Sequence, residues 1–117
     1  MMPLERLRTL STITEVDPEH ASAFVRDPLP GMLLIPGDPL RPEVNDVAVV
    51  LTELVERFPA IRVAVASIGQ EATMRGRFGV AAFPALLFVK GGEVVTALSR
   101  MQAWSAYETA ARALGGA

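Results

Sequence analysis

The sequence has no cysteine among its 117 residues. Thiol–disulfide exchange requires a thiolate that attacks sulfur, so this chain cannot perform it. The chain also has a single histidine, His20. Because zinc sites in proteins combine several histidine, cysteine or carboxylate ligands, we expect no zinc site built from protein ligands here. Any function of the chain must therefore be non-redox.

Long apolar runs, a leader pattern and an excess of basic charge are also missing. No apolar run approaches the roughly 20 residues of a membrane span, and residues 1–6 lack the basic-then-apolar order of a signal peptide. The net charge is −2, and both signs are spread along the chain, unlike the basic stripe of a nucleic-acid binder. We expect a cytoplasmic protein that neither binds nucleic acid nor inserts directly into a membrane.

No catalytic constellation is present either. Residues 76–79 lack the Gly-Lys-Ser/Thr ending of a phosphate loop, and the serines have no nucleophile-elbow context. His20 lies beside Glu19 on an expected helix, where it is interpreted as a solvated residue. We expect no cofactor, no metal and no enzymatic activity, because an enzyme would need a borrowed cofactor for which the sequence shows no site.

The apolar pattern predicts one small α/β domain over residues 13–117, preceded by a short helix or mobile arm over residues 1–12. Asp17 and Pro18 form a helix start. Apolar residues at helical spacing predict the longest helix over residues 42–58. Strands are expected at 13–16, 32–35, 62–68, 85–89 and 93–98, and helices at 18–26, 42–58, 70–78 and 104–114. This order predicts a mixed sheet of four to five strands with helices on both faces.

Residues 76–94 (GRFGVAAFPALLFVKGGEV) resemble the second half of a thioredoxin-like domain. Pro84 stands where thioredoxins carry a cis proline, and an X-Pro bond adopts the cis form at low cost. When residues 42–58 are laid on the second thioredoxin helix, the Cys-Gly-Pro-Cys quartet falls on residues 41–44 and the buried aspartate on Ile35. The kinking proline of that helix falls on Val49, so this helix is expected to run straight.

A narrower resemblance comes from residues 37–51 (GDPLRPEVNDVAVVL), 77–80 with 83–86, and 104–107. Together they are similar to the cysteine-free hydrogenase expression proteins of the HyaE/HupG type, over about residues 13 to 114. The resemblance implies a cytoplasmic accessory protein for maturation of a nickel–iron hydrogenase small subunit. Its partners would be the small-subunit precursor with its twin-arginine signal peptide, and other hydrogenase accessory proteins.

The thioredoxin resemblance also indicates a place for such a partner. In thioredoxins the backbone before the cis proline can pair with an extended segment, and here that residue is Phe83, next to Pro84. One interpretation makes a set of nearby apolar side chains the rim of a groove for the signal peptide. The other is ordinary core packing. The set comprises Leu40, Phe83, Met101 and Trp104.

Three carboxylates have two interpretations as well. Asp38, Glu43 and Asp46 lie near the start of the long helix, where they could bind the two guanidinium groups of a twin-arginine motif. Acidic residues at a helix N-terminus are already favoured by the helix dipole. Arg41 could pair with Glu43 or Asp46 on the surface, where ion pairs contribute little.

Two functions remain open at this point. The first is a redox-inactive chaperone that binds an extended precursor segment around Pro84 without covalent chemistry. The second is a structural or scaffold subunit whose apolar face is a fixed protein–protein interface. Binding that persists after deletion of the signal peptide would favour the second.

Overall fold

The computed structural model describes residues 3–8 and 13–115. The described residues form a five-stranded mixed sheet in the order β1-β3-β2-β4-β5. Its strands are β1 (Ile13–Val16), β2 (Gly31–Ile35), β3 (Arg62–Ala66), β4 (Ala85–Lys90) and β5 (Glu93–Ser99). β3 is parallel to β1 and β2, and β4 is antiparallel to β2 and β5. The predicted mixed sheet and its final hairpin are confirmed.

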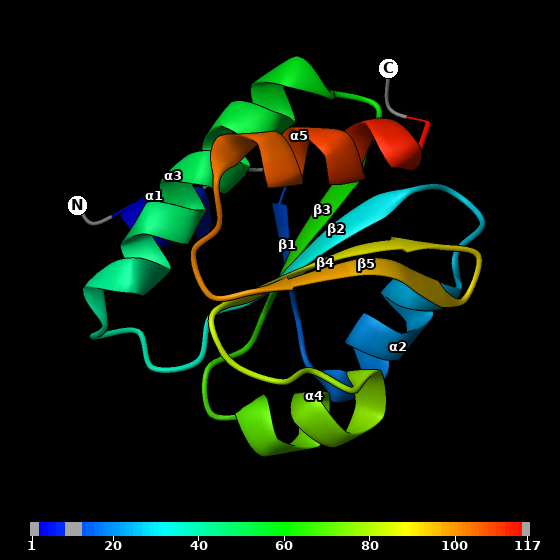
Figure 1. Cartoon of the computed structure of the whole chain (residues 1–117). Coiled ribbons are helices and arrows are strands. Elements are labelled where there is room, and N and C mark those ends of the chain that lie inside the picture. Colours follow the sequence, from blue (N-terminus) through cyan, green and yellow to red (C-terminus); the bar gives the residue numbers. More distant parts are fainter. Residues whose placement is uncertain (1–2, 9–12, 116–117) are drawn as a thin grey trace.

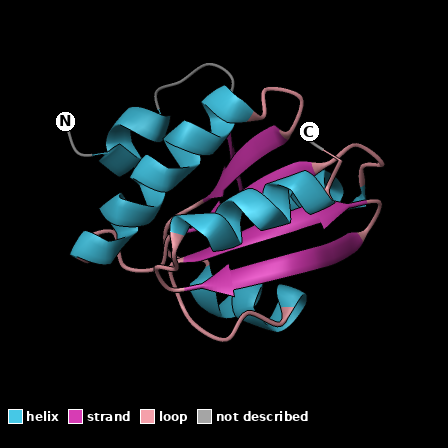
Figure 2. Cartoon of the chain, turned by 45° about the horizontal axis from the view of Figure 1, so that its top comes forward, coloured by secondary structure: helices cyan, strands magenta, loops and turns pink. Residues whose placement is uncertain are grey.

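Helices cover both faces of this sheet, as the sequence predicts (Figures 1 and 2). One face carries α1 (Pro3–Arg8), α3 (Pro42–Arg57) and α5 (Trp104–Ala113), and the other carries α2 (Pro18–Arg26) and α4 (Glu71–Phe78). Pro42 occupies the first turn of α3, and the helix continues without interruption through Val49. Asp17 caps α2 by accepting a hydrogen bond from the His20 amide at 2.8 Å.

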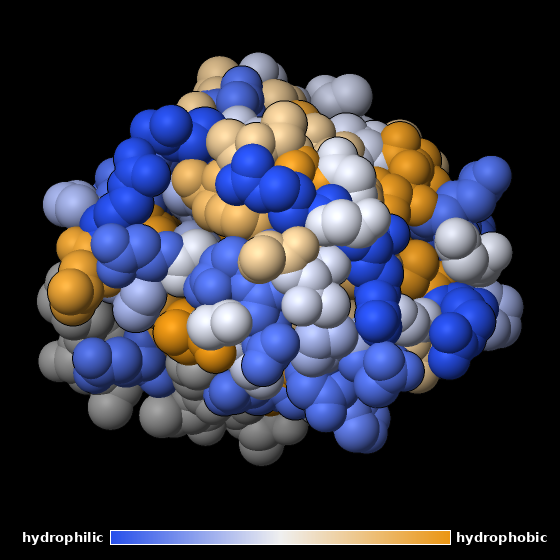
Figure 3. Space-filling model, turned by 90° about the horizontal axis from the view of Figure 1, so that it is seen from below, coloured by the Kyte–Doolittle hydropathy of each residue, from blue (hydrophilic) through white to orange (hydrophobic). Residues whose placement is uncertain are grey.

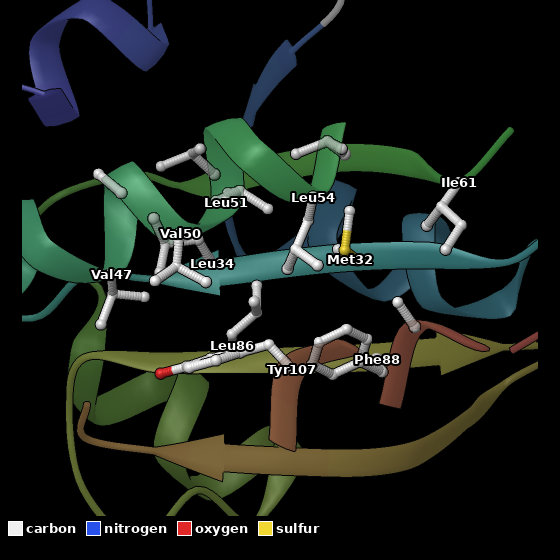
Figure 4. Packing of buried hydrophobic residues seen from close by; sticks show 14 of the residues in the cluster. Met32, Leu34, Val47, Val50, Leu51, Leu54, Ile61, Leu86, Phe88 and Tyr107 are labelled. Carbon is white, nitrogen blue, oxygen red and sulfur yellow. The ribbon is translucent and has the colours of Figure 1, made fainter. Parts of the chain in front are cut away.

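The larger apolar cluster lies between the sheet and α3 with α5. Figure 4 shows β2 and β4 contributing alternate side chains that meet those of the helices. Tyr107 from α5 is fully buried in this cluster. A smaller cluster on the other face joins β2, β3 and β4 to α2 and α4. Because both faces are covered, all five residues of β2 are buried.

The N-terminal segment forms a helix that lies against α3. Leu4 is buried, and its amide donates a hydrogen bond to the Asn45 side chain at 3.2 Å. Of the two forms expected for residues 1–12, a short helix is therefore present at residues 3–8. The rest of that expected arm, residues 1–2 and 9–12, lies outside the described residues.

Most predicted boundaries lie within one residue of those in the structure, and the end of β3 differs by two. β3 ends at Ala66 and not at Ile68, because the chain turns at Gly69, which has a φ of +90°. Ile68 is consequently exposed at the end of the sheet.

Candidate functional site

Four connecting segments meet at one end of the sheet. β2 and β3 are parallel, so residues 36–41 and 67–70 leave them at the same end. β4 is antiparallel to both β2 and β5, so residues 81–84 and 100–103 also lie at that end. Figure 1 shows this end at the left and lower left, away from the β4–β5 turn. We call these four segments the open end.

Phe83 precedes Pro84 in the open end and is half-buried. Its peptide bond to Pro84 is cis, as predicted. The Pro84 carbonyl accepts a hydrogen bond from the Arg100 amide at 2.7 Å. Among the described residues, the amide and carbonyl of Phe83 have no hydrogen-bond partner. These two groups can therefore pair with an added extended segment.

The Pro84 side chain does not share this availability. It is buried, so the predicted contact between Pro84 and a partner is not supported by its position.

The Phe83 side chain is held from two sides. A Cβ atom added to Gly37 would lie 2.6 Å from the Cβ of Phe83. The Arg75 guanidinium of α4 lies 5.0 Å from the ring centroid of Phe83, and its Nη1 donates to the Ala81 carbonyl at 3.4 Å. Gly37 and Arg75 were not predicted as site residues. No sequence pattern places α4 against this turn, because that contact forms only in the folded chain.

Three apolar side chains of the open end face solvent. Leu40 is 89% exposed, Met101 42% and Ile68 41%. Leu40 and Met101 were predicted as rim residues, and their exposure agrees with that interpretation. Ile68 was missed because the apolar run before it predicted a longer buried strand.

Trp104 is placed differently. It is partly buried against the larger apolar cluster, and the Arg57 guanidinium of α3 lies 5.2 Å from its ring centroid. This cation–π contact joins α3 to α5. The position of Trp104 agrees with the core-packing interpretation more closely than with a free rim.

Glu43 is already occupied within the molecule. Its two carboxylate oxygens share the single N–H of Arg100 Nε, at 2.8 and 3.1 Å, and Oε2 also accepts a hydrogen bond from the Met101 amide at 2.7 Å. Arg41 Nη2 lies 3.7 Å from the same carboxylate. The Met101 hydrogen bond, together with Arg100, lowers the pKa of Glu43 below its ordinary value.

The other two predicted carboxylates are exposed. Asp38 accepts a hydrogen bond from the Leu40 amide at 2.9 Å, which shapes the loop before α3. Asp46 lies on the outer side of the first turns of α3, and among the described residues it has no ion pair. Asp38 and Asp46 therefore offer accessible carboxylate oxygens, whereas Glu43 offers few.

The surface seen from the side of α4 is mixed. In Figure 3 apolar side chains form separate patches between charged and polar ones. The described residues contain no group of three or more histidine, cysteine, aspartate or glutamate side chains that could hold a metal ion. Within the same residues, no helix combines the length and apolar character needed to cross a bilayer.

The fold and this site define a thioredoxin-like domain whose open end carries no thiol. Mitochondrial thioredoxin 3 of Saccharomyces cerevisiae superposes with a TM-score of 0.75 at 13% identity, covering 88% of this chain and 96% of that one. Thioredoxin O2 of Arabidopsis thaliana gives 0.72 at 16%, covering 89% and 95%. These likenesses confirm the predicted fold.

The family follows from sequence. Residues 4–107 match the family model described as hydrogenase-1 expression protein HyaE, and the chain belongs to this family. It is similar to the hydrogenase expression/formation proteins HoxO of Azotobacter vinelandii, 36% identical over 89% of this chain and 71% of that protein, and HupG of Rhizobium leguminosarum bv. viciae, 34% identical over 91% and 77%. These relatives support a role in hydrogenase maturation.

Proposed function

We propose that this chain is a non-catalytic chaperone for maturation of a nickel–iron hydrogenase. It binds the small-subunit precursor and its twin-arginine signal peptide in the cytoplasm before export. Binding is noncovalent and takes place at the open end, where the partner adds an extended segment beside Phe83.

The observation that carries the proposal is the backbone of Phe83. Its amide and carbonyl have no partner among the described residues, while the neighbouring Pro84 carbonyl is paired. Exposed backbone groups next to a sheet supply main-chain hydrogen bonds to an added strand without requiring a particular sequence. Signal peptides vary in sequence, so this mode of binding suits them.

Apolar and acidic side chains add selectivity. Leu40, Ile68 and Met101 expose apolar surface at the open end, which suits the hydrophobic stretch of a signal peptide. Asp38 and Asp46 lie at the α3 side of the same end, where they suit the two arginines.

The test is titration of a synthetic twin-arginine signal peptide against the wild type and two double variants. Leu40→Gln/Met101→Gln removes apolar surface from the open end. Its matched control, Leu29→Gln/Val95→Gln, changes side chains that are 59% and 47% exposed elsewhere. We expect about tenfold weaker binding for the first, equivalent to ~1.4 kcal/mol, and unchanged binding for the control.

Other results would overturn the proposal. Equal affinity of both double variants would remove the open end as the docking surface, and absence of wild-type binding would remove the peptide-binding function. A precursor that binds equally well after deletion of its signal peptide would favour a scaffold with a fixed interface.

A further inference from the structure

Several hydrogen bonds converge on the turn that carries Met101. The Arg100 amide donates to the Pro84 carbonyl at 2.7 Å, and the Arg100 side chain donates to both oxygens of Glu43. The Met101 amide donates to Glu43 Oε2 at 2.7 Å. This turn is therefore joined both to the segment before β4 and to the first turn of α3.

The Tyr107 hydroxyl also makes hydrogen bonds to the turn that carries Met101. It accepts a hydrogen bond from the Gln102 amide at 3.1 Å and lies 3.4 Å from the Arg100 carbonyl, to which it can donate. Figure 4 shows the Tyr107 ring within the apolar cluster, with its oxygen at the end away from Phe88. The turn thus rests on a buried side chain that has little freedom to move.

Arg100 adopts a conformation that needs such support. Its φ is +65°, and among the described residues it is the one non-glycine residue with a positive φ. A side chain in the left-handed region is unfavourable and persists where surrounding contacts fix it. The contacts to Glu43, Pro84 and Tyr107 supply that restraint.

We infer that Glu43 is a positioning residue of the open end: its carboxylate clasps Arg100 and the Met101 amide, and this holds Met101 at the docking surface. Glu43 is then not a contact for a partner's arginine. The expected effect of Glu43 on peptide binding rests on the proposed function. Its expected effect on the conformation of the Met101 turn does not.

The occupancy of the carboxylate supports this assignment. Both oxygens of Glu43 already share the charge-assisted hydrogen bond from Arg100 Nε. An arginine from a partner would compete with Arg100 and the Met101 amide for these oxygens, on a side chain that is only 20% exposed. Asp38 and Asp46 are exposed at the same end, so they remain the acids that can receive a partner's arginines.

Two variants separate positioning from direct contact. Glu43→Gln weakens both parts of the clasp, and Arg100→Gly removes the contact with the Arg100 side chain while allowing the positive φ. If Glu43 positions Met101, both variants weaken binding of a synthetic peptide with two adjacent arginines before an apolar stretch, by about tenfold. If Glu43 instead binds the partner, Arg100→Gly frees its carboxylate and tightens binding.

Amide hydrogen exchange measures the turn itself. We expect the Met101 amide to exchange about tenfold faster in Glu43→Gln and in Arg100→Gly, which corresponds to ~1.4 kcal/mol of lost protection. Glu53→Gln, which changes an exposed acid further along α3, is the matched control and should leave exchange and affinity unchanged.

Each outcome decides the matter. Faster exchange with weaker binding in both clasp variants supports the inference. Unchanged exchange, or faster exchange with unchanged or tighter binding, overturns it. If the wild type binds no peptide, the proposed function fails, and the assignment of Glu43 is then decided by Met101 exchange alone.

Discussion

Each end of the sheet contains a glycine, a phenylalanine and an arginine in contact, but the backbone around them is paired differently. At the end opposite the open end, Gly31 lies against Phe24, where an added Cβ would come within 2.7 Å of the ring. The Arg62 guanidinium lies 4.2 Å from the Phe24 ring centroid. Its Nη2 donates to the Phe24 carbonyl at 3.1 Å and to the Leu29 carbonyl at 2.6 Å. We call this the closed end.

The β4–β5 turn completes the closed end. The Gly91 amide donates to the Asp27 carbonyl at 2.9 Å, and the Gly92 amide donates to the Val25 carbonyl at 2.8 Å. The turn is thereby tied to the end of α2. Backbone groups that would otherwise attract another chain are used internally.

The open end contains the same combination of glycine, phenylalanine and arginine. It lacks the hydrogen bonds that tie the β4–β5 turn to α2 at the closed end. Gly37 touches Phe83, and Arg75 lies over its ring, yet the Phe83 amide and carbonyl remain unpaired among the described residues. An arginine stacked on a phenylalanine is therefore a packing device that both ends share. What distinguishes the open end is the Phe83 amide and carbonyl, which have no hydrogen-bond partner among the described residues.

The largest expected effect is on Gly37. Gly37→Ala combines a positive φ with a contact at 2.6 Å from the Cβ of Phe83, an atom fixed near the backbone, so we expect a loss of about 3 kcal/mol in unfolding free energy. Gly91→Ala at the closed end is the matched control. Its φ is +59° with no atom within 4 Å, so its loss should be about 1 kcal/mol. Equal losses in urea denaturation would contradict the contact with Phe83.

The second prediction concerns replacement of the stacked arginine at each end of the sheet. Arg62→Ala loses two hydrogen bonds to carbonyls and the contact with Phe24, and we expect a loss of about 2 kcal/mol. The loss is limited because Arg62 Nε is buried without a partner among the described residues. Arg75→Ala, at the exposed position over Phe83, should cost about 0.5 kcal/mol. If thermal unfolding shows equal costs, the two ends do not differ in closure.

The smallest effect concerns pH. The folded-state pKa of Glu43 is lowered, first by the Met101 amide, so its ionised form stabilises the fold. That contribution is fully present above the ordinary pKa of a glutamate and is lost as pH falls through the lower folded pKa. The stability difference between wild type and Glu43→Gln should therefore shrink on acidification in urea titrations. A difference that is constant with pH would contradict the clasp.

Much of the fold could be predicted because the signals are local. Asp17 and Pro18 start α2, Pro42 starts α3, and the apolar period over that helix matches its buried face. The end of β3 was wrong at Ile68, since an apolar residue beyond a buried strand carries the same local signal as one within it.

The candidate site was harder to predict. Leu40 and Met101 are exposed, as a rim requires, whereas Trp104 packs beside α3 and Pro84 is buried. Glu43 is paired with Arg100, which is 57 residues away in sequence. Ion pairs between distant segments depend on the register and packing of whole elements, and no local pattern encodes them.

The sequence by itself determined the absence of thiol chemistry, the order of strands and helices, and the family. Those properties depend on which residues are present and on short-range periodicity. Only the tertiary structure decided which backbone groups stay unpaired and which carboxylates stay accessible. Each such group is free or occupied according to partners that folding brings from other strands and helices.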